Sequence, residues 1–147
     1  MFFAAEPLLI ARLNTIKAPE VKVFSADDLQ GVVENSQYAP AYHLVFNNYG
    51  APTEKIGIGG LVEIPQSWTV VVVASHYSTT LTGQSKRAVA DALCDTVLNG
   101  LLGYKLSTDF KELELESGQE IINGAAYIFM PLTFSTRLIY RGTCIAS

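Results

Sequence analysis

Trp68-Thr69-Val70-Val71-Val72-Val73-Ala74-Ser75 is the stretch that decides the fold of this chain. Side chains alternate between the two faces of a β-strand, and here the residues at both odd and even positions are mainly apolar. This pattern predicts a central strand that is covered on both faces. A second strand is predicted at Leu61–Ile64, and Pro65-Gln66-Ser67 separates the two.

The clearest helix is predicted from Gln84 to Leu101, just after the central strand. Its apolar side chains recur at helical spacing and form one stripe, which is expected to pack on the sheet beside Trp68–Ser75 and to bury Leu93. Gly100 and Gly103 each offer a way to end the helix. The stripe contains Val89, Ala92, Leu93, Thr96, Val97 and Leu101, whereas Lys86, Arg87, Asp91 and Asp95 lie largely off it.

Shorter elements are predicted before the central strand. A helix is predicted that is centred on Leu8–Leu13, and Pro7 is compatible with it only if it lies in the first turn or causes a kink. A strand at Val21–Phe24 leads into Ser25-Ala26-Asp27-Asp28, which has the spacing of a capping box and predicts a short helical turn after it. Tyr42–Phe46 alternates as a strand.

Two strands are predicted after the long helix, at Phe110–Glu116 and Tyr127–Tyr140, with turn signals at Gly118 and Asn123-Gly124 between them. The chain has 147 residues, which is close to the commonest size of one domain. Together the elements predict an α+β fold: a single domain over residues 1–147, with a small, mainly antiparallel sheet packed by two main helices.

The composition favours a protein that works by contact with other subunits. Hydrophobic residues make up 49% of the chain and charged residues only 16%, whereas ordinary soluble domains carry about a quarter charged residues. Burial of part of this apolar surface against partners explains the composition better than a monomer with a slightly apolar surface does. The net charge of -4 argues against tight, sequence-independent binding to nucleic acid.

Membrane and export signals are not expected. The apolar run Val70–Ala74 is far shorter than the roughly 18 residues that a spanning helix needs. Met1–Pro7 has neither the basic region nor the long apolar region of a signal peptide. Cys94 and Cys144 form neither a metal-type pair nor a disulfide framework, so they fit assembly in a reducing cytoplasm, where both are expected to be buried or inert.

No catalytic, cofactor-binding or metal-binding set is predicted. His43 and His76 lie in strand-like contexts, where a lone histidine is more often a packed or surface residue than a ligand. Gly83-Gln84-Ser85-Lys86-Arg87 lacks the last glycine of a nucleophile elbow. Gly57-Ile58-Gly59-Gly60 lacks the Lys-Ser/Thr that follows in a phosphate-binding loop, and no convincing helix opens after it.

The acidic stretch from Asp109 to Glu120 has two interpretations. Its glutamates at 112, 114 and 116 alternate with Leu113 and Leu115, which places them on the wet face of a half-buried strand. A solvated face is the simpler interpretation, and a charged face with an electrostatic role in an assembly is the alternative. Acid–base or cation chemistry by paired carboxylates is less favoured.

The order of these elements resembles the tail-terminator (tail-completion) proteins of tailed bacteriophages, including the group in Mu-like phages and prophages. The resemblance spans nearly the whole chain and rests on element order, length and local sequence. The segments that carry it are Pro7–Leu13, the Val-x-Val strand with Ser25–Leu29, the helix ending Leu98-Asn99-Gly100-Leu101-Leu102-Gly103-Tyr104, and the last hairpin with Tyr127-x-Phe129 and Leu132-Thr133-Phe134-Ser135-Thr136.

The resemblance implies a structural virion protein without catalytic residues, assembled in the host cytoplasm. It implies a ring of six copies at the head-proximal end of the tail tube. Such a ring stops tube polymerisation, docks head-completion (neck) proteins and lets DNA pass through its lumen without specific binding. Another head–tail connector or a minor tail protein stays open as an alternative, and a small-ligand domain or an enzyme as an outside one.

Two sets of residues are candidates for contacts in such a ring. Asn47–Gly60 contains four glycines and one proline, and reads as a mobile loop or as the arm of a long hairpin. We expect it to project from the domain and to touch a neighbouring subunit or the adjacent ring through Tyr49, Lys55, Ile56 and Ile58. The acidic candidates for the lumen wall are Glu112, Glu114 and Glu116.

Overall fold

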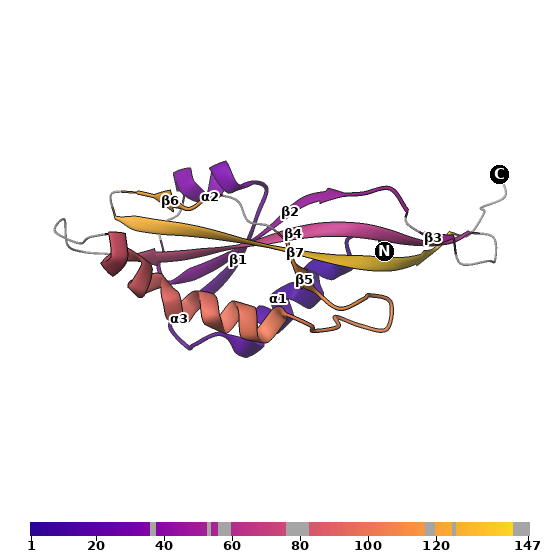
Figure 1. Ribbon diagram of the computed structural model, residues 1–147, viewed down its shortest axis with the longest axis horizontal. Coiled ribbons are helices and arrows are strands. Elements are labelled where there is room, and N and C mark those ends of the chain that lie inside the picture. Colours follow the sequence, from indigo (N-terminus) through magenta and orange to yellow (C-terminus); the bar gives the residue numbers. More distant parts are fainter. Residues whose placement is uncertain are drawn as a thin grey trace.

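A single twisted sheet runs along the length of the molecule and organises the rest (Figure 1). The computed structural model describes residues 1–35, 38–52, 54–55, 60–75, 83–116, 120–124 and 126–142. In chain order the elements are α1 (Ala5–Ile16), β1 (Lys22–Ala26), α2 (Leu29–Asn35), β2 (Ala41–Tyr49), β3 (Glu54–Lys55), β4 (Leu61–Ser75), α3 (Gly83–Leu101), β5 (Glu114–Leu115), β6 (Ile122–Asn123) and β7 (Tyr127–Arg141).

The sheet contains seven strands in the described part of the chain, with the order β1-β2-β4-β7-β5. β3 also pairs with β4, and β6 also pairs with β7. β1 and β2 are parallel, and every other described pair is antiparallel. The predicted α+β class with a mainly antiparallel sheet is therefore confirmed.

β4 is the central strand that the valine run predicts, since β2 and β7 pair with it on either side. The predicted break at Pro65-Gln66-Ser67 is wrong, because β4 continues unbroken from Leu61 to Ser75. The Pro65 carbonyl accepts a hydrogen bond from the Gly50 N–H at 2.9 Å, just where β2 ends. A proline lacks a backbone N–H, and this position beside the end of a neighbouring strand tolerates its absence.

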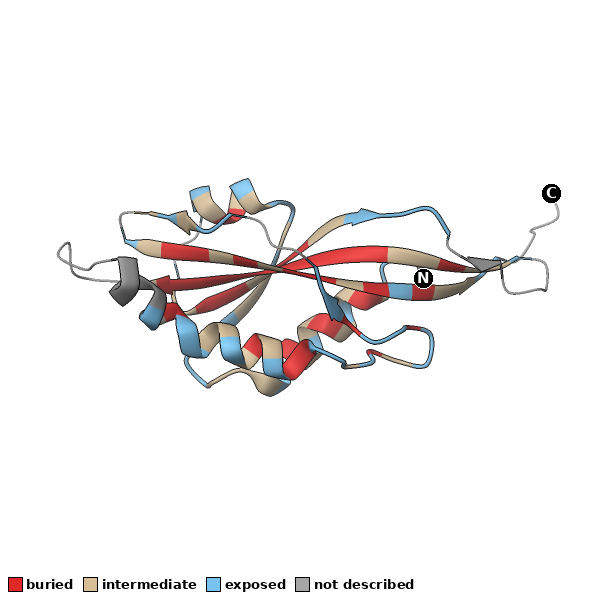
Figure 2. Ribbon diagram, viewed as in Figure 1, coloured by how far each residue is buried: buried red, intermediate tan, exposed pale blue. Residues whose placement is uncertain are grey.

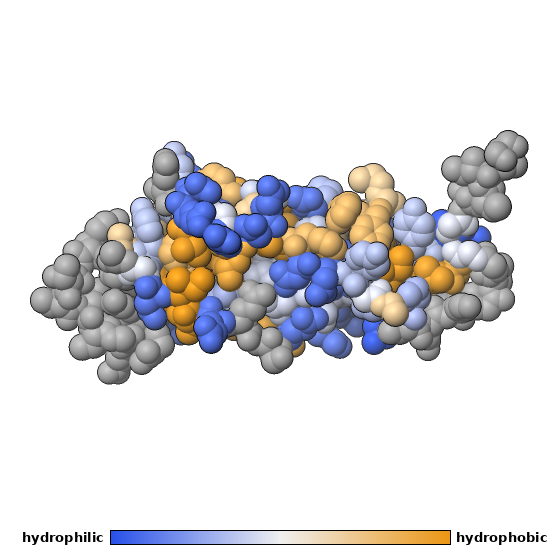
Figure 3. Space-filling view, turned by 90° about the horizontal axis from the view of Figure 1, so that it is seen from above, coloured by the Kyte–Doolittle hydropathy of each residue, from blue (hydrophilic) through white to orange (hydrophobic). Residues whose placement is uncertain are grey.

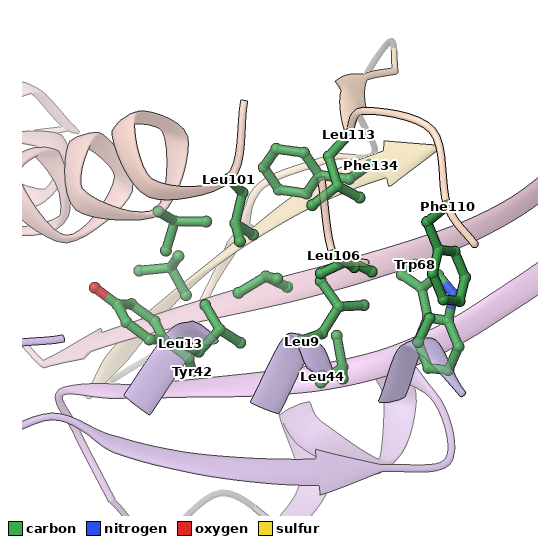
Figure 4. Packing of buried hydrophobic residues seen from close by; sticks show 14 of the residues in the cluster. Leu9, Leu13, Tyr42, Leu44, Trp68, Leu101, Leu106, Phe110, Leu113 and Phe134 are labelled. Atoms are coloured by element: carbon green, nitrogen blue, oxygen red, sulfur yellow. The ribbon is translucent and has the colours of Figure 1, made fainter. Parts of the chain in front are cut away.

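The two faces of the sheet carry different layers. α1 and α3 pack on one face, which we call the core face, and α2 lies on the other, which we call the α2 face (Figure 1). The main core fills the space between the two long helices and the core face, where the labelled side chains of Figure 4 point toward one another. Its largest fully buried members are Trp68, Tyr42, Phe110, Phe134, Leu9, Leu13, Leu44, Leu101 and Leu113.

α1 confirms the predicted N-terminal helix and extends it at both ends. Pro7 is the third residue of the helix, where its missing N–H costs nothing because the first four N–H groups of a helix have no intrahelical partner. The predicted capping box is wrong in the residue that caps the helix. Ser25 lies in β1 and donates its hydroxyl to Glu6 Oε1 at 2.5 Å, while Asp28 Oδ1 accepts from the Gly31 N–H at 2.6 Å and caps α2.

α3 confirms the predicted long helix, but its buried face is rotated from the predicted stripe. Ala92 is exposed and Leu93 is half-buried, still packed against the core. The described residues that face inward are Ala90, Leu93, Cys94, Val97, Leu98 and Leu101. As predicted, Asp91 and Asp95 are exposed, whereas the side chains of Lys86, Arg87 and Val89 lie outside the described part.

The two glycines near the end of α3 have different roles. Gly103 has a φ of 73° just beyond the last helical residue, so it ends the helix as predicted. Gly100 does not end it. A Cβ at Gly100 would lie 2.3 Å from Ile16 Cδ1, so this glycine allows α1 and α3 to approach closely.

The predicted strand Phe110–Glu116 is shorter in the structure, where β5 covers only Glu114 and Leu115. Leu113 is buried as predicted, and its N–H donates to the Tyr104 carbonyl while its carbonyl accepts from the Gly103 N–H, both at 2.9 Å. These bonds tie Leu113 to the turn after α3. The prediction that Leu115 packs inward with Leu113 is wrong, because Leu115 is 48% exposed.

Candidate assembly surface

The α2 face of the sheet has a covered half and an open half. Under α2 and β6 the sheet presents mainly apolar side chains, namely Ala41, Val45, Val71, Val73 and Phe129, with His43 beside Val71 on the same face. Beyond α2 the same strands present mostly polar side chains on this face, and none of the described helices lies over them (Figure 1). Figure 3 shows this face from above, with hydrophilic residues over its middle.

A connected set of polar side chains forms the floor of the open half. Asn47 Nδ2 donates to Thr69 Oγ1 at 2.6 Å and to Ser67 Oγ at 3.3 Å. The hydroxyls of Thr69 and Thr133 lie 2.9 Å apart, and Ser67 Oγ donates to Glu116 Oε2 at 3.2 Å. These residues line a hollow of about 890 Å³ that reaches to Asp27 and Asp28 at the start of α2. Because its polar groups already bond one another, the floor is ordered without a ligand.

A buried carboxylate lies farther along the same face. Glu63 is 4% exposed, and its two oxygens lie 3.6 Å from Lys111 Nζ and 3.9 Å from Arg137 Nη1. Both cationic side chains are about half exposed, so solvent screens these ion pairs. The arrangement places two cationic groups beside the acidic residues of β5.

The three acidic candidates lie close together in the structure, on and beside β5. Glu112, Glu114 and Glu116 are all exposed and line one hollow of about 510 Å³, which Lys111 and Arg137 also line. Glu114 pairs with Ser135 in the β5–β7 register, and Glu116 reaches Ser67. The local surface is therefore of mixed sign, because the two cationic groups offset part of the acidic charge.

An aromatic group lies at the β2 edge of the sheet, on the core face. Phe2, Phe3, Phe46, Tyr49 and Trp68 contact one another edge to face, with ring centroids 4.9 to 6.5 Å apart. Phe3 is 50% exposed and Tyr49 is 62% exposed. Exposed aromatic side chains that adjoin one another are typical of protein interaction sites.

The predicted loop over Asn47–Gly60 is largely an arm of the sheet. β2 continues through Tyr49, and β3 then pairs Glu54 and Lys55 with β4. Of the four candidate contact residues, Tyr49 belongs to the aromatic group, and Lys55 is placed by its backbone in β3. Ile56 and Ile58 lie outside the described residues.

Burial shifts the pKa of two titratable side chains on the core face, Tyr42 and Cys94. Burial raises the pKa of Tyr42 to about 12, and its hydroxyl donates to the Leu93 carbonyl at 3.2 Å. Burial, together with Asp91 and Asp95, raises the pKa of Cys94 to about 11, so its thiol stays protonated at neutral pH.

His43 stacks on Phe24 with centroids 5.0 Å apart, and burial lowers its pKa. Its Nε2 is buried and has no hydrogen-bond partner among the described residues. His76, Cys144 and the loop Gly57-Ile58-Gly59 lie outside the described residues. Within the described ranges no group of three or more His, Cys, Asp or Glu side chains could hold a metal ion, and none of the helices there is both long and apolar enough to span a bilayer.

The polar floor was not predicted, although the sequence contains a signal for it. Along Glu63-Ile64-Pro65-Gln66-Ser67-Trp68-Thr69, glutamate, proline, serine and threonine occupy every second position. This alternation is typical of a strand with one wet face. The expected break at Pro65 hid the pattern, because it divided one strand into two.

Fold and surface together describe a small α+β protein with the exposed aromatic residues Phe3 and Tyr49 at one sheet edge. A sequence model of the family described as phage tail terminator protein matches residues 1–144. The chain therefore belongs to the phage tail terminator family, whose members are structural components of the virion tail. A search of curated proteins found no match to it.

Proposed function

We propose that this chain forms a ring, of six copies, that caps the head-proximal end of the tail tube. The ring stops tube polymerisation and offers its other side to head-completion proteins, while DNA passes through its lumen. The family match over residues 1–144 carries the proposal. The exposed aromatic group at the β2 edge supports it, because a lone domain gains nothing by leaving Phe3 and Tyr49 in water.

The experiment compares tails made in cells with and without this chain by electron microscopy. Without it, tubes should vary in length and stay unjoined to heads, and supplying the chain should restore uniform tails. Labelled chain should lie at the head-proximal tube end. Label within the head connector or along the tail would support another connector or a minor tail protein instead. A strict monomer within the particle would contradict the ring.

We also propose that the β5 region faces the lumen, with Glu112, Glu114 and Glu116 repelling DNA phosphates within about the 10 Å Debye length. Their exposure supports this proposal, while Lys111 and Arg137 in the same hollow weaken the expected field. Replacing all three glutamates with Gln should leave assembly intact and slow DNA release. Lost assembly with normal tubes would instead place these residues at a docking surface.

A further inference from the structure

Beyond α2, two neighbouring rows of side chains cross the sheet from one edge to the other. The first row pairs Leu115 with Phe134, Phe134 with Trp68, and Trp68 with Phe46, and it is apolar throughout. The next row pairs Glu114 with Ser135, Ser135 with Ser67, and Ser67 with Asn48, and it is polar throughout. Paired residues in a sheet point to the same face. The apolar row therefore lies on the core face and the polar row on the α2 face.

Both rows end at sheet edges that have free backbone groups. Glu116 N–H donates to the Thr133 carbonyl at 2.9 Å, and alternate residues of an antiparallel strand face the same neighbour. The N–H and carbonyl of Leu115 therefore point away from β7. Leu113, two residues earlier, bonds with Gly103 and Tyr104. Within the described chain, no segment pairs with the outward side of Leu115.

The opposite edge is free for a similar reason. Gly50 N–H donates to the Pro65 carbonyl, so the N–H and carbonyl of Tyr49 point away from β4. β1 covers this edge only as far as the pair Ala26 and Val45. Among the described strands, none pairs with the outer edge of β2 beyond Val45.

Each end of the apolar row also exposes apolar surface on the core face. Leu115 is 48% exposed at the β5 end. At the β2 end, Phe3 and Tyr49 are at least half exposed and extend the contact that Phe46 makes with Trp68. The two edges lie on opposite sides of the molecule, but both end the same apolar row. Both also expose apolar side chains on the core face.

We propose that these two edges pair between copies of this chain, so that β5 of one copy lies antiparallel along Phe46–Tyr49 of the next. The direction follows from the sheet order, because β7 runs parallel to β2 and β5 runs opposite to β7. The pairing seats Leu115 on the aromatic group of its neighbour.

A contact between two different edges of identical copies is heterologous, and it closes into a ring when the rotation between copies closes. The inference rests on the proposed ring and specifies which surfaces form it. Each junction continues the apolar row and the polar row from one subunit into the next. Unpaired sheet edges can pair unspecifically with other chains, and in the assembly both edges are paired with neighbouring subunits.

The test is cysteine cross-linking in assembled protein, in a chain that carries Cys94→Ala and Cys144→Ser. Tyr49→Cys and Leu115→Cys are made separately and together, and a short bismaleimide links thiols that lie close. The double variant should give a ladder of linked oligomers. A mixture of the two single variants should give linked dimers and nothing larger, and each single variant alone should stay monomeric on denaturing gels.

The matched control replaces Leu115→Cys with Ile121→Cys. Ile121 is also exposed, but it precedes β6, which pairs with β7 at Phe129, whereas Leu115 pairs with β7 at Phe134. It should give no ladder with Tyr49→Cys. Linkage of Leu115→Cys to itself would overturn the inference in favour of a two-fold contact. The inference would be overturned, with the proposed ring unaffected, if intact rings gave no linkage between positions 49 and 115. The same holds if either cysteine were linked only to another tail protein. Absence of rings altogether would contradict the proposed function.

A second pair of variants covers the case in which the cysteines disturb folding. Tyr49→Arg or Leu115→Glu alone should lose the oligomer in light scattering while thermal unfolding stays unchanged. The two combined in one chain should restore it, because opposite charges then meet across each junction. Loss of the oligomer that the combination fails to restore would contradict direct contact between these edges.

Discussion

The two halves of the α2 face differ although the same strands build both. Val71 and Thr69 are two residues apart on β4 and point to the same face, yet Val71 lies in an apolar cluster under α2 and Thr69 in a hydrogen-bonded polar floor. Figure 2 shows that burial follows β4 and β7 past the point where α2 ends. The difference teaches that one strand can lie in an apolar cluster over half its length and carry a hydrogen-bonded polar face over the rest.

A covering layer is what separates the two halves. Where a helix covers the sheet, each apolar side chain gains by leaving water. Where no described helix covers it, polar side chains that bond one another hold the face in order, and Ser67, Thr69 and Thr133 are themselves buried. Variants placed in pairs, one in a covered and one in an uncovered part of the sheet, can break or sharpen this comparison.

The largest contrast is expected between two leucines that contact the core face. Leu9 is 1% exposed in α1, so Leu9→Ala should lower the free energy of unfolding by about 2–5 kcal/mol. Leu115 is 48% exposed at the edge, so Leu115→Ala should change it by less than about 0.5 kcal/mol but weaken oligomer formation. Urea unfolding and light scattering measure the two effects. Equal losses of stability would show that the β5 edge belongs to the folded core.

A smaller contrast is expected between isosteric changes in the two halves of the α2 face. Val71→Thr puts a hydroxyl into an apolar cluster and should cost about 1–3 kcal/mol, as for a buried group without a partner. Thr133→Val removes one hydroxyl, but Thr69 keeps its bond from Asn47, so the cost should be about 1 kcal/mol or less. Urea unfolding of both variants tests this order. The reverse order would mean that the polar floor holds the fold more firmly than the valines do.

The smallest effect is expected from pH, through His43 on the covered half. Burial lowers its pKa from the unfolded value of 6.5, so the unfolded chain binds the proton more readily. The stability that neutral His43 contributes is complete above pH 6.5 and decreases as the pH falls below that value. His43→Phe keeps the stack on Phe24 and should reduce the loss between about pH 8 and about pH 5.5. An unchanged loss in thermal unfolding would assign it to other groups.

Much of the fold could be predicted because its signals are local. The valine run requires burial on both faces, and Val70 and Val72 indeed lie in the main core while Val71 and Val73 lie in the cluster under α2. Pro7 permits only the first turn of a helix, and Gly103 tolerates the backbone that ends one. The break at Pro65 was predicted wrongly, because a proline stops a strand only where its N–H is needed, and that depends on which strand lies beside it.

The sequence by itself determined the α+β class, the central strand, the two long helices and the family resemblance, since apolar periodicity and element order are properties of the chain. Tertiary structure alone decided that Leu115 is exposed while Leu113 is buried, and that Glu63, Lys111 and Arg137 meet on one face. It also decided which sheet edges are free. The physical reason is that exposure and pairing depend on what segments distant in the sequence cover, and a local pattern carries no record of that.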